Sequence, residues 1–394
     1  MSAVPRPPDR FAHSAPPVGL RAALAAAAFL ACGPTLGCGG GGGLAAAGGR
    51  PPAAGDAGTG AGGSPVIDVP PGGGAGGGAG AAGAAGTPAC PGESDDPASP
   101  PQALALSGNL GAHDPAALVV GNEIYLFATG LIAKTSGDLT SWTAAASPLT
   151  PLPAWVASSV PGATNLWAPD ISTFGGTYHL YYAASTFGSN TSCIGQATRA
   201  SLTGGAWSDQ GSVICSNVGH TGDDWNAIDP NVVVDDAGTP WLAFGSFWGG
   251  IKMVQLTSAG ARADATLYSL AARPAADGAL EGAWIFKRCG SYYLFTSWGS
   301  CCSSPYDYNI RVGRAASVTG PYVDQAGTPL LQGGGTLLVQ GNSTWIAPGH
   351  NAVIAYGGKT YNLYHALTPG DMTATLRVAE LAWDANGWPV SGGP

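Results

Sequence analysis

The chain has 394 residues, of which only 10% are charged, and a formal net charge of -9. This composition provides no basic face to hold phosphates, so it argues against nucleic-acid binding and favours neutral ligands. Its 12 Trp and 13 Tyr supply aromatic faces of the kind that stack on sugar rings, although such side chains also pack between β-sheets.

The first 38 residues have the pattern of an export signal. Three arginines precede the apolar run at residues 22–31, which is too short to span a bilayer as a helix and has the length of a signal-peptide core. Cys32 and Cys38 each follow a segment similar to a bacterial lipoprotein cleavage site, without the usual Leu three places earlier. We therefore expect an exported protein, either freely extracellular or a cell-surface lipoprotein attached through Cys32 or Cys38.

Residues 39–101 consist largely of Gly, Ala and Pro. Such a segment buries too little apolar surface to offset the entropy of ordering, so we expect a disordered linker there. One compact domain should follow, over residues 102–394. Its short β-branched and aromatic runs, its frequent Gly and Pro turns and its lack of any long helical periodicity predict an all-β fold.

One hairpin pattern occurs five times in this domain. In the clearest copy, Asp229 and Pro230 lead a β-branched strand, a turn at residues 236–238 and an aromatic strand that ends at Phe244. The leading residues of the five copies are Asp114, Asp170, Asp229, Glu281 and Asn351. The last aromatic residue lies 12 to 15 positions after each leader, and successive leaders are 52 to 70 positions apart. Five units of about four strands predict a five-bladed β-propeller, with a β-sandwich as the alternative.

In a propeller the first strand of each blade lines a central channel, so the five leaders should meet at one mouth of it. Four leaders are acidic. Carboxylates gathered in one funnel repel each other and lose hydration, which raises the pKa of some and leaves others ionised. That arrangement separates a general acid from a general base. Each single Asp could instead be an ordinary turn or strand-start residue, but the repeat favours a shared cavity.

The domain contains five of the eight cysteines: Cys193, Cys215, Cys289, Cys301 and Cys302. In an exported protein they are expected to form disulfides, and no C-x-x-C pair with a matching His or Cys pair indicates a zinc site. We expect Cys193 to pair with Cys215 and Cys289 to pair with Cys301 or Cys302. One thiol of the five is then left over.

Seven sequence words give the domain a specific resemblance. They are HDP (113–115), LWAPD (166–170), NAIDPN (226–231), GSFWGG (245–250), LEGAW (280–284), YYLFTSWGSCC (292–302) and APGHN (347–351). In this order and spacing, from about Leu104 to the C-terminus, they resemble glycoside hydrolase family 43 and within it the endo-1,5-α-L-arabinanases. The resemblance implies a five-bladed propeller, in agreement with the repeats, and hydrolysis of α-1,5-linked L-arabinan.

The resemblance also implies roles for three carboxylates. Asp114 would be the general base that activates water, Glu281 the general acid that protonates the leaving oxygen, and Asp229 the residue that orients the acid and tunes its pKa. Because Asp114 and Glu281 lead the non-adjacent blades 1 and 4, we expect their carboxyl groups to face each other across the funnel. A separation of roughly 6.5 to 9.5 Å would admit a water molecule and predicts inversion at the anomeric carbon.

The remaining motif residues are predicted to bind substrate or metal. Contacts to arabinose units are implied for Trp167, Phe187, Asn226 and Ser246, with core or turn roles as the alternative. His350 of the APGHN motif is implied to ligate an ion, often calcium, whose other ligands are largely water; a structural histidine is the alternative. We expect Asp170 to be structural and His113 to support the Asp114 loop by hydrogen bonding.

Two further functions remain open. One keeps the family and changes the substrate, to an exo-acting β-xylosidase or α-L-arabinofuranosidase, although the NAIDPN, GSFWGG and double-Cys words favour the endo-arabinanase. The other is a non-catalytic carbohydrate-binding propeller, against which the presence of all three carboxylates argues. We expect a monomer that acts on arabinan or arabino-oligosaccharides and uses no organic cofactor.

Overall fold

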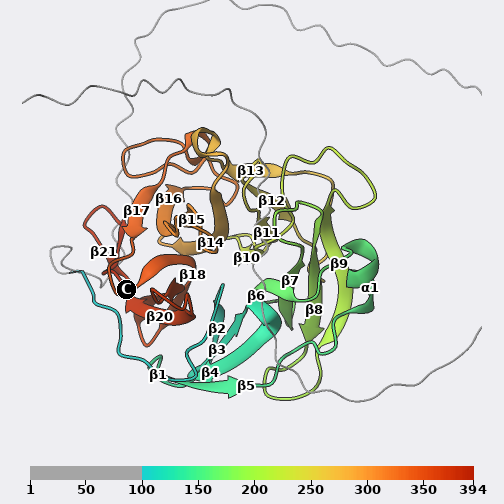
Figure 1. Ribbon diagram of the computed structural model, residues 1–394, viewed down its shortest axis with the longest axis horizontal. Coiled ribbons are helices and arrows are strands. Elements are labelled where there is room, and N and C mark those ends of the chain that lie inside the picture. Colours follow the sequence, from blue (N-terminus) through green and yellow to red (C-terminus); the bar gives the residue numbers. More distant parts are fainter. Residues whose placement is uncertain (1–99) are drawn as a thin grey trace, which may run out of the picture. The chain divides into compact units, whose positions relative to one another are not determined.

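The computed structural model describes residues 100–394 (Figure 1). The expected export signal at residues 1–38, and all but the last two residues of the expected linker, lie outside this range. Within residues 100–394 no helix is long and apolar enough to cross a membrane. The described chain consists of sheets, antiparallel apart from one parallel strand pair, placed around a common centre, which confirms the five-bladed β-propeller (Figure 1).

Each blade is a sheet whose strands follow one another in the sequence. Blade 1 contains β1 (Ser107–Gly108), β2 (Ala116–Val120), β3 (Glu123–Ala128), β4 (Ile132–Ser136) and β5 (Ser141–Ala145). Blade 2 contains β6 (Leu166–Phe174), β7 (Thr177–Ala184), β8 (Ser192–Arg199) and β9 (Ser208–Ser216). Blade 3 contains β10 (Asn231–Val234), β11 (Pro240–Phe244), β12 (Ile251–Gln255) and β13 (Tyr268–Ala271).

The last two blades complete the ring. Blade 4 contains β14 (Leu280–Arg288), β15 (Ser291–Trp298), β16 (Asn309–Ala315) and β17 (Thr336–Val339). Blade 5 contains β18 (Ile346–Tyr356), β19 (Lys359–Leu367) and β20 (Ala374–Glu380), and β21 (Ala382–Trp383) pairs with β22 (Pro389–Val390) in a separate small sheet. The helical segments are short: α1 (Ala154–Ser159), η1 (Thr129–Leu131), η2 (Pro274–Ala276) and η3 (Leu330–Gln332).

The innermost strands of neighbouring blades contact one another around the whole ring. β2 contacts β6 and β18, β10 contacts β6 and β14, and β14 contacts β18. Blade 5 has only three strands of its own. The segment around β1 covers the outer strand β20 of blade 5, because Leu104 N donates to Val378 O at 2.7 Å and Leu376 N donates to Leu110 O at 2.8 Å. The two ends of the domain are thereby joined.

The repeated hairpin exists because each copy buries its last aromatic residue. Phe127, Tyr182, Phe244, Phe295 and Tyr364 are at most 4% exposed. Burying one such side chain contributes about 2 kcal/mol, so the second strand of every blade is held firmly in the core. The turns are as tight as the constant spacing predicts. Gly175–Gly176 and Gly357–Gly358 take positive φ values, which two-residue hairpin turns require and glycine adopts at no steric cost.

The disulfide predictions are confirmed in one case and wrong in the other. Cys193 is bonded to Cys215 between β8 and β9, as expected. Cys301 is bonded to its neighbour Cys302, and neither pairs with Cys289. Cys289 lies in the turn before β15, whereas Cys301 follows the far end of this strand of 8 residues, roughly 26 Å away at about 3.3 Å per residue. All five cysteines of the domain are disulfide-bonded, so none of them is the leftover thiol.

Candidate active site

Three of the five leaders meet around one histidine. Asp114 and Asp229 lie just before β2 and β10, Glu281 is the second residue of β14, and His350 lies within β18. His350 Nδ1 is 3.1 Å from Asp114 Oδ1, and His350 also interacts electrostatically with Asp229 and Glu281. Asp114, Asp229 and His350 have φ values of 54°, 58° and 47°. Residues other than glycine seldom adopt this left-handed backbone conformation, and such backbone strain is concentrated at functional sites.

The Asp114 carboxylate is held from both sides. Thr129 Oγ1 donates to Asp114 Oδ2 at 2.5 Å, and His113 Nδ1 lies 2.7 Å from the same oxygen. Burial alone would raise the pKa of Asp114, but its interactions with His113 and His350 outweigh burial and hold the pKa well below its usual range. Asp114 is therefore ionised at neutral pH and can accept a proton.

The negative charge of Asp114 raises the pKa of the two histidines beside it. Burial lowers the pKa of His350, but the negative charges of Asp114 and Asp229 have the larger effect and raise this pKa to about 9. The pKa of His113 is also raised, because the attraction of Asp114 outweighs burial. The expectation that His113 supports Asp114 by hydrogen bonding is confirmed.

His365 is a third histidine in this cluster, and the sequence patterns did not single it out. It is fully buried, stacks on His113 with ring centroids 4.2 Å apart, and accepts a hydrogen bond from Asp114 N to its Nδ1 at 3.1 Å. Because Nδ1 accepts, the ring proton of neutral His365 is on Nε2. Burial keeps the pKa of His365 well below its usual value, so this ring remains neutral.

Asp229 and Glu281 form the other half of the site. Asp229 Oδ2 accepts a hydrogen bond from the backbone N of Gly282 at 3.0 Å, which ties it to the residue next to Glu281. Ser246 Oγ donates to Glu281 Oε2 at 2.6 Å, and the Tyr308 hydroxyl also bonds Glu281. Burial raises the pKa of both carboxyl groups; the charge of Glu281 raises the pKa of Asp229 further, and the charge of Asp114 raises that of Glu281. One proton is therefore retained in this half of the site.

Several of these partners share one place in the repeat. Thr129, Ser246 and Ser297 each lie two positions after the last aromatic residue of their blade. Thr129 bonds Asp114, Ser246 bonds Glu281, and Ser297 Oγ accepts from His350 N at 2.7 Å. In an antiparallel hairpin the end of the second strand lies beside the start of the first, so this position lies at the mouth where the leaders of the same and the next blade begin. Reading the repeat two residues further would have found these three side chains.

Two leaders do not join the cluster. Asp170 Oδ1 accepts from Asn231 Nδ2 at 3.0 Å, and Asn231 Oδ1 accepts from Ile285 N at 2.8 Å, a chain that links blades 2, 3 and 4. Asp170 also lines a cavity of about 310 Å³ between the innermost strands, and burial raises its pKa to about 7. Asn351 Nδ2 donates to Asn362 Oδ1 at 2.8 Å within blade 5. The expectation that all five leaders share one mouth therefore holds only for Asp114, Asp229 and Glu281.

The residues predicted to contact substrate have different surroundings. Phe187 is 75% exposed in the loop after β7, as an aromatic platform for a ligand would be. Trp167 is half-buried in β6, and the buried Asn226 donates from Nδ2 to Ser189 O at 3.4 Å. Asn226 Oδ1 has no hydrogen-bond partner among residues 100–394. Ser246 bonds Glu281, as described above, so it is part of the acidic half of the site.

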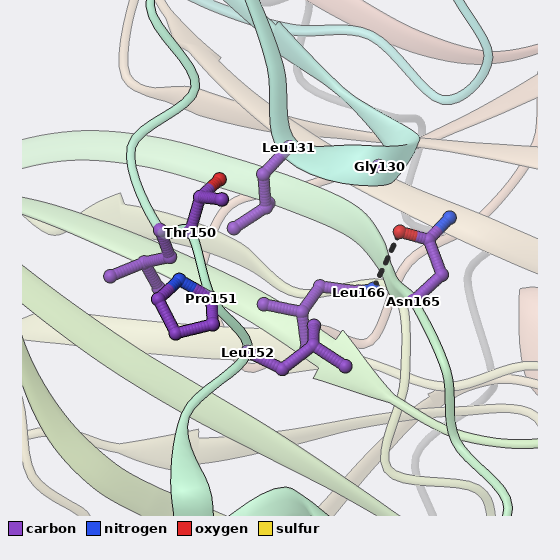
Figure 2. A pocket seen from close by; sticks show the side chains of 8 residues that line it. Gly130, Leu131, Thr150, Pro151, Leu152, Asn165 and Leu166 are labelled. Carbon is purple, nitrogen blue, oxygen red and sulfur yellow. Dashed lines mark hydrogen bonds between the residues drawn. The ribbon is translucent and has the colours of Figure 1, made fainter. Parts of the chain in front are cut away.

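A second, smaller cavity lies between blades 1 and 2. Figure 2 shows its lining residues, which include Leu131, Leu152 and Leu166, and its volume is about 160 Å³. Gly130 and Leu131 directly follow Thr129, and Leu166 directly precedes Trp167. The Trp167 segment is in turn fixed to the site, because Ala168 N donates to Thr129 Oγ1 at 2.9 Å.

Comparisons with known proteins agree with this geometry. The family model described as Glycosyl hydrolases family 43 matches residues 108–389. The chain is 42% identical over 229 residues to "Extracellular endo-alpha-(1->5)-L-arabinanase 1" of Bacillus subtilis, covering 56% of this chain and 70% of the relative. It is 37% identical over 299 residues to "Extracellular exo-alpha-(1->5)-L-arabinofuranosidase ArbA" of Cellvibrio japonicus, covering 70% and 85%. The solved structure "GH43 Endo-Arabinanase from Bacillus licheniformis" has a TM-score of 0.67 and 41% identity, covering 73% and 99%. The family match includes every residue of the site.

Proposed function

The chain belongs to glycosyl hydrolases family 43, and on that basis we propose that it hydrolyses α-1,5-linked L-arabinan by a single displacement that inverts the anomeric carbon. The observation that supports this most is the opposite perturbation of two carboxyl groups in one site. The pKa of Asp114 is held well below its usual range, whereas the pKa of Glu281 is raised. One group is thus prepared to take a proton and the other to give one.

In the proposed mechanism Glu281 donates its proton to the glycosidic oxygen as the bond to the anomeric carbon breaks. Asp114 removes a proton from a water molecule that attacks the same carbon from the opposite face. His113 and Thr129 hold the Asp114 carboxylate during this step. Asp229 is proposed to position the acid through its hydrogen bond to Gly282 N and to tune the pKa of Glu281, which burial and the charge of Asp114 raise. The separation of roughly 6.5 to 9.5 Å between the Asp114 and Glu281 carboxyl groups stays a prediction.

Trp167, Phe187 and Asn226 are proposed to bind the arabinose units. Phe187 offers an exposed ring for stacking, and the unpartnered Asn226 Oδ1 is an acceptor for a sugar hydroxyl. Ser246 would act on the same reaction through Glu281. The alternative substrate mode, exo-acting release of single arabinofuranose units, is supported by the likeness to the C. japonicus relative, whose name specifies that activity.

The product pattern tests the proposed function. Linear α-1,5-arabinan should be converted to short oligosaccharides, as expected of an enzyme that cuts within the chain, whereas xylo-oligosaccharides should remain intact. Chromatography of products over time distinguishes oligosaccharides from single arabinose units. NMR of the first products should show the inverted anomer. Activity on xylan alone would contradict the substrate, and a retained anomer would contradict the role of Asp114.

Ser246→Ala should move the alkaline limb of the pH profile of kcat/KM to higher pH. Its hydroxyl bonds the carboxylate of Glu281 and thereby lowers the pKa of that group, so its removal raises the pKa and keeps the acid protonated further up the scale. At the optimum kcat should fall by about tenfold at most, since a hydrogen bond to a charged group contributes about 1.5 kcal/mol. Ser246→Thr keeps the hydroxyl and is the control. An unchanged or downward-shifted limb in Ser246→Ala would contradict this coupling.

His350 is proposed to hold a calcium or similar ion. Its Nδ1 faces Asp114, which leaves Nε2 as the ligand nitrogen, and a carboxylate behind the imidazole is the usual support of a metal-binding histidine. Neither group of three potential ligands found among residues 100–394 includes His350, so water would complete the coordination. The bound ion would supply positive charge near the three carboxylates. With a single protein ligand, the ion should be held weakly.

Exhaustive chelation should therefore lower the Tm or the activity of the wild-type protein, and added calcium should restore it. An ion held weakly stabilises the fold only while its concentration exceeds its Kd. His350→Ala should be insensitive to both treatments, as measured by thermal melts with and without chelator. If the wild-type protein responds to neither treatment, His350 does not bind an ion and has a structural role instead.

We also propose that the protein is exported and monomeric. The B. subtilis and C. japonicus relatives are both named extracellular, and disulfides persist in oxidising compartments. Attachment to a membrane would depend on Cys32 or Cys38, which lie outside the described residues. Incorporation of a labelled fatty acid into the wild-type chain, and its loss in Cys32→Ala or Cys38→Ala, would distinguish a lipoprotein from a freely secreted enzyme.

A further inference from the structure

The bond between the adjacent residues Cys301 and Cys302 does little for the stability of the fold. A disulfide stabilises a protein mainly by closing a loop in the unfolded chain, and the effect grows with the number of residues in the loop. Cys193 and Cys215 are 22 positions apart, whereas Cys301 and Cys302 are 1 apart and close no loop of chain. The role of this bridge must therefore be sought in its surroundings.

Those surroundings include the proposed general base. Cys302 Sγ lies 3.6 Å from His113 Nε2, and His113 Nδ1 lies 2.7 Å from Asp114 Oδ2. One imidazole ring thus separates the disulfide from the Asp114 carboxylate. Cys302 is exposed and Cys301 is half-buried, so a small thiol can reach the bridge, while Cys193 is fully buried. Exposed disulfides are the ones that thiol exchange opens most easily.

The same three side chains have the composition of a metal site. His113 Nε2, Cys301 Sγ and Cys302 Sγ all lie within 4.8 Å of one another. Two thiolates and an imidazole are the ligands that zinc and other thiophilic cations prefer. As long as the two sulfur atoms are bonded to each other, neither is a thiolate. The disulfide therefore prevents the two sulfur atoms from acting as metal ligands.

We propose that the Cys301–Cys302 bridge is opened by small thiols, and that the two resulting thiols and His113 form a binding site for one thiophilic divalent cation. In the first step a thiolate attacks the exposed Cys302 Sγ, the sulfur–sulfur bond breaks, and Cys301 leaves as a thiolate. A second thiol releases Cys302, so that the disulfide and two thiols yield two cysteines and one oxidised reductant, a two-electron exchange. The cation then displaces two protons from the cysteines and takes His113 Nε2 as third ligand.

Filling this site should inhibit the enzyme. The bound cation places a divalent charge one ring away from Asp114 and fixes the ring that supports this carboxylate. In an oxidising medium the bridge stays closed and the same cation should have no effect through this site. The closed disulfide thus prevents thiophilic cations from binding beside the active site, and its reduction by thiols permits this binding.

The test uses the full chain and cadmium as the probe. The protein is treated with limiting dithiothreitol, freed of reductant under anaerobic conditions, and alkylated in a sample for mass spectrometry. Cys301 and Cys302 should be labelled before Cys193, Cys215 and Cys289, which are also disulfide-bonded. The remaining protein is titrated with Cd²⁺, and the ultraviolet charge-transfer band of cadmium thiolate is recorded against the oxidised protein, whose signal is subtracted. One additional Cd²⁺ should bind per reduced chain, and arabinan hydrolysis should fall only in the reduced form.

Three variants separate this site from others. Cys301→Ser/Cys302→Ser should show no cadmium thiolate band after reduction. His113→Ala, or His113→Gln if the first does not fold, should bind Cd²⁺ more weakly by at least about tenfold, the loss that even an outer partner of a metal ligand causes. His220→Ala, at an exposed histidine bonded to Asp223, should bind as the wild type does. A band that persists in the double variant, affinity unchanged in both His113 variants, or earlier labelling of Cys193 would overturn the proposal. The spectroscopic result does not depend on arabinan being the substrate.

Discussion

Asp114→Ala is expected to lower kcat on linear arabinan by about 10²- to 10⁴-fold, the usual contribution of a general base. The reason is that no other carboxylate of the site can replace it. Asp229 and Glu281 both have raised pKa values and share the task of keeping a proton, while the pKa of Asp114 alone lies well below the usual range. Initial rates of reducing-sugar release, measured near neutral pH, give the loss directly.

The control for this change is the same substitution at the leader that lies apart from the cluster. Asp170→Ala should affect the Tm more than kcat, because it removes a carboxyl group whose partner is Asn231, in the hydrogen-bond chain that links blades 2, 3 and 4. Circular dichroism melts show whether each variant is folded. If Asp170→Ala lost as much activity as Asp114→Ala at an unchanged Tm, the assignment of the base to Asp114 would be wrong.

Glu281→Ala is expected to cause a loss of the same size on arabinan, but its activity should depend on the leaving group. An aryl glycoside of an arabino-oligosaccharide needs little protonation when its phenol is acidic, so it should recover much of the lost rate. Asp114→Ala should recover none, since water must still be deprotonated. The measurement is kcat for a series of aryl leaving groups in both variants. Equal recovery in the two variants would show that the acid and base roles are exchanged or shared.

Much of the fold follows from patterns that are local in the chain. The spacing from each leader to its last aromatic residue is a property of one hairpin, and burial of that residue holds the hairpin in place, as for Phe244 and Phe295. Five such hairpins at regular intervals leave a closed ring as the simplest arrangement. The number of blades, and the presence of Asp114, Asp229 and Glu281 in one site, could therefore be predicted. So could the Cys193–Cys215 bond, which joins two neighbouring strands.

Contacts between residues far apart in the sequence could not be predicted in the same way. His365 bonds the backbone of Asp114 across 251 positions, and Tyr308 reaches Glu281 from the residue before β16, the third strand of blade 4. Neither residue has a distinctive local pattern. The placement of His365 depends on how blade 5 packs against blade 1, and that of Tyr308 on the loop that leads into β16 of blade 4. The packing of blade 2 against blade 3 places Asp170 beside Asn231, away from the other acidic leaders.

The pairing of the cysteines shows the division most clearly. Sequence reasoning placed Cys289 with Cys301 or Cys302 because strands β14 and β15 are neighbours, and that neighbourhood is real. The length of β15, however, puts the two positions at opposite ends of the strand, so the adjacent cysteines bond each other instead. Hydrophobic and aromatic periodicity, which depends only on near neighbours, determined the blades. The contact of His350 with the Asp114 carboxylate and the position of the Cys301–Cys302 bridge beside His113 were decided by tertiary packing. These contacts join segments far apart in the sequence, and no local pattern encodes their distance in space.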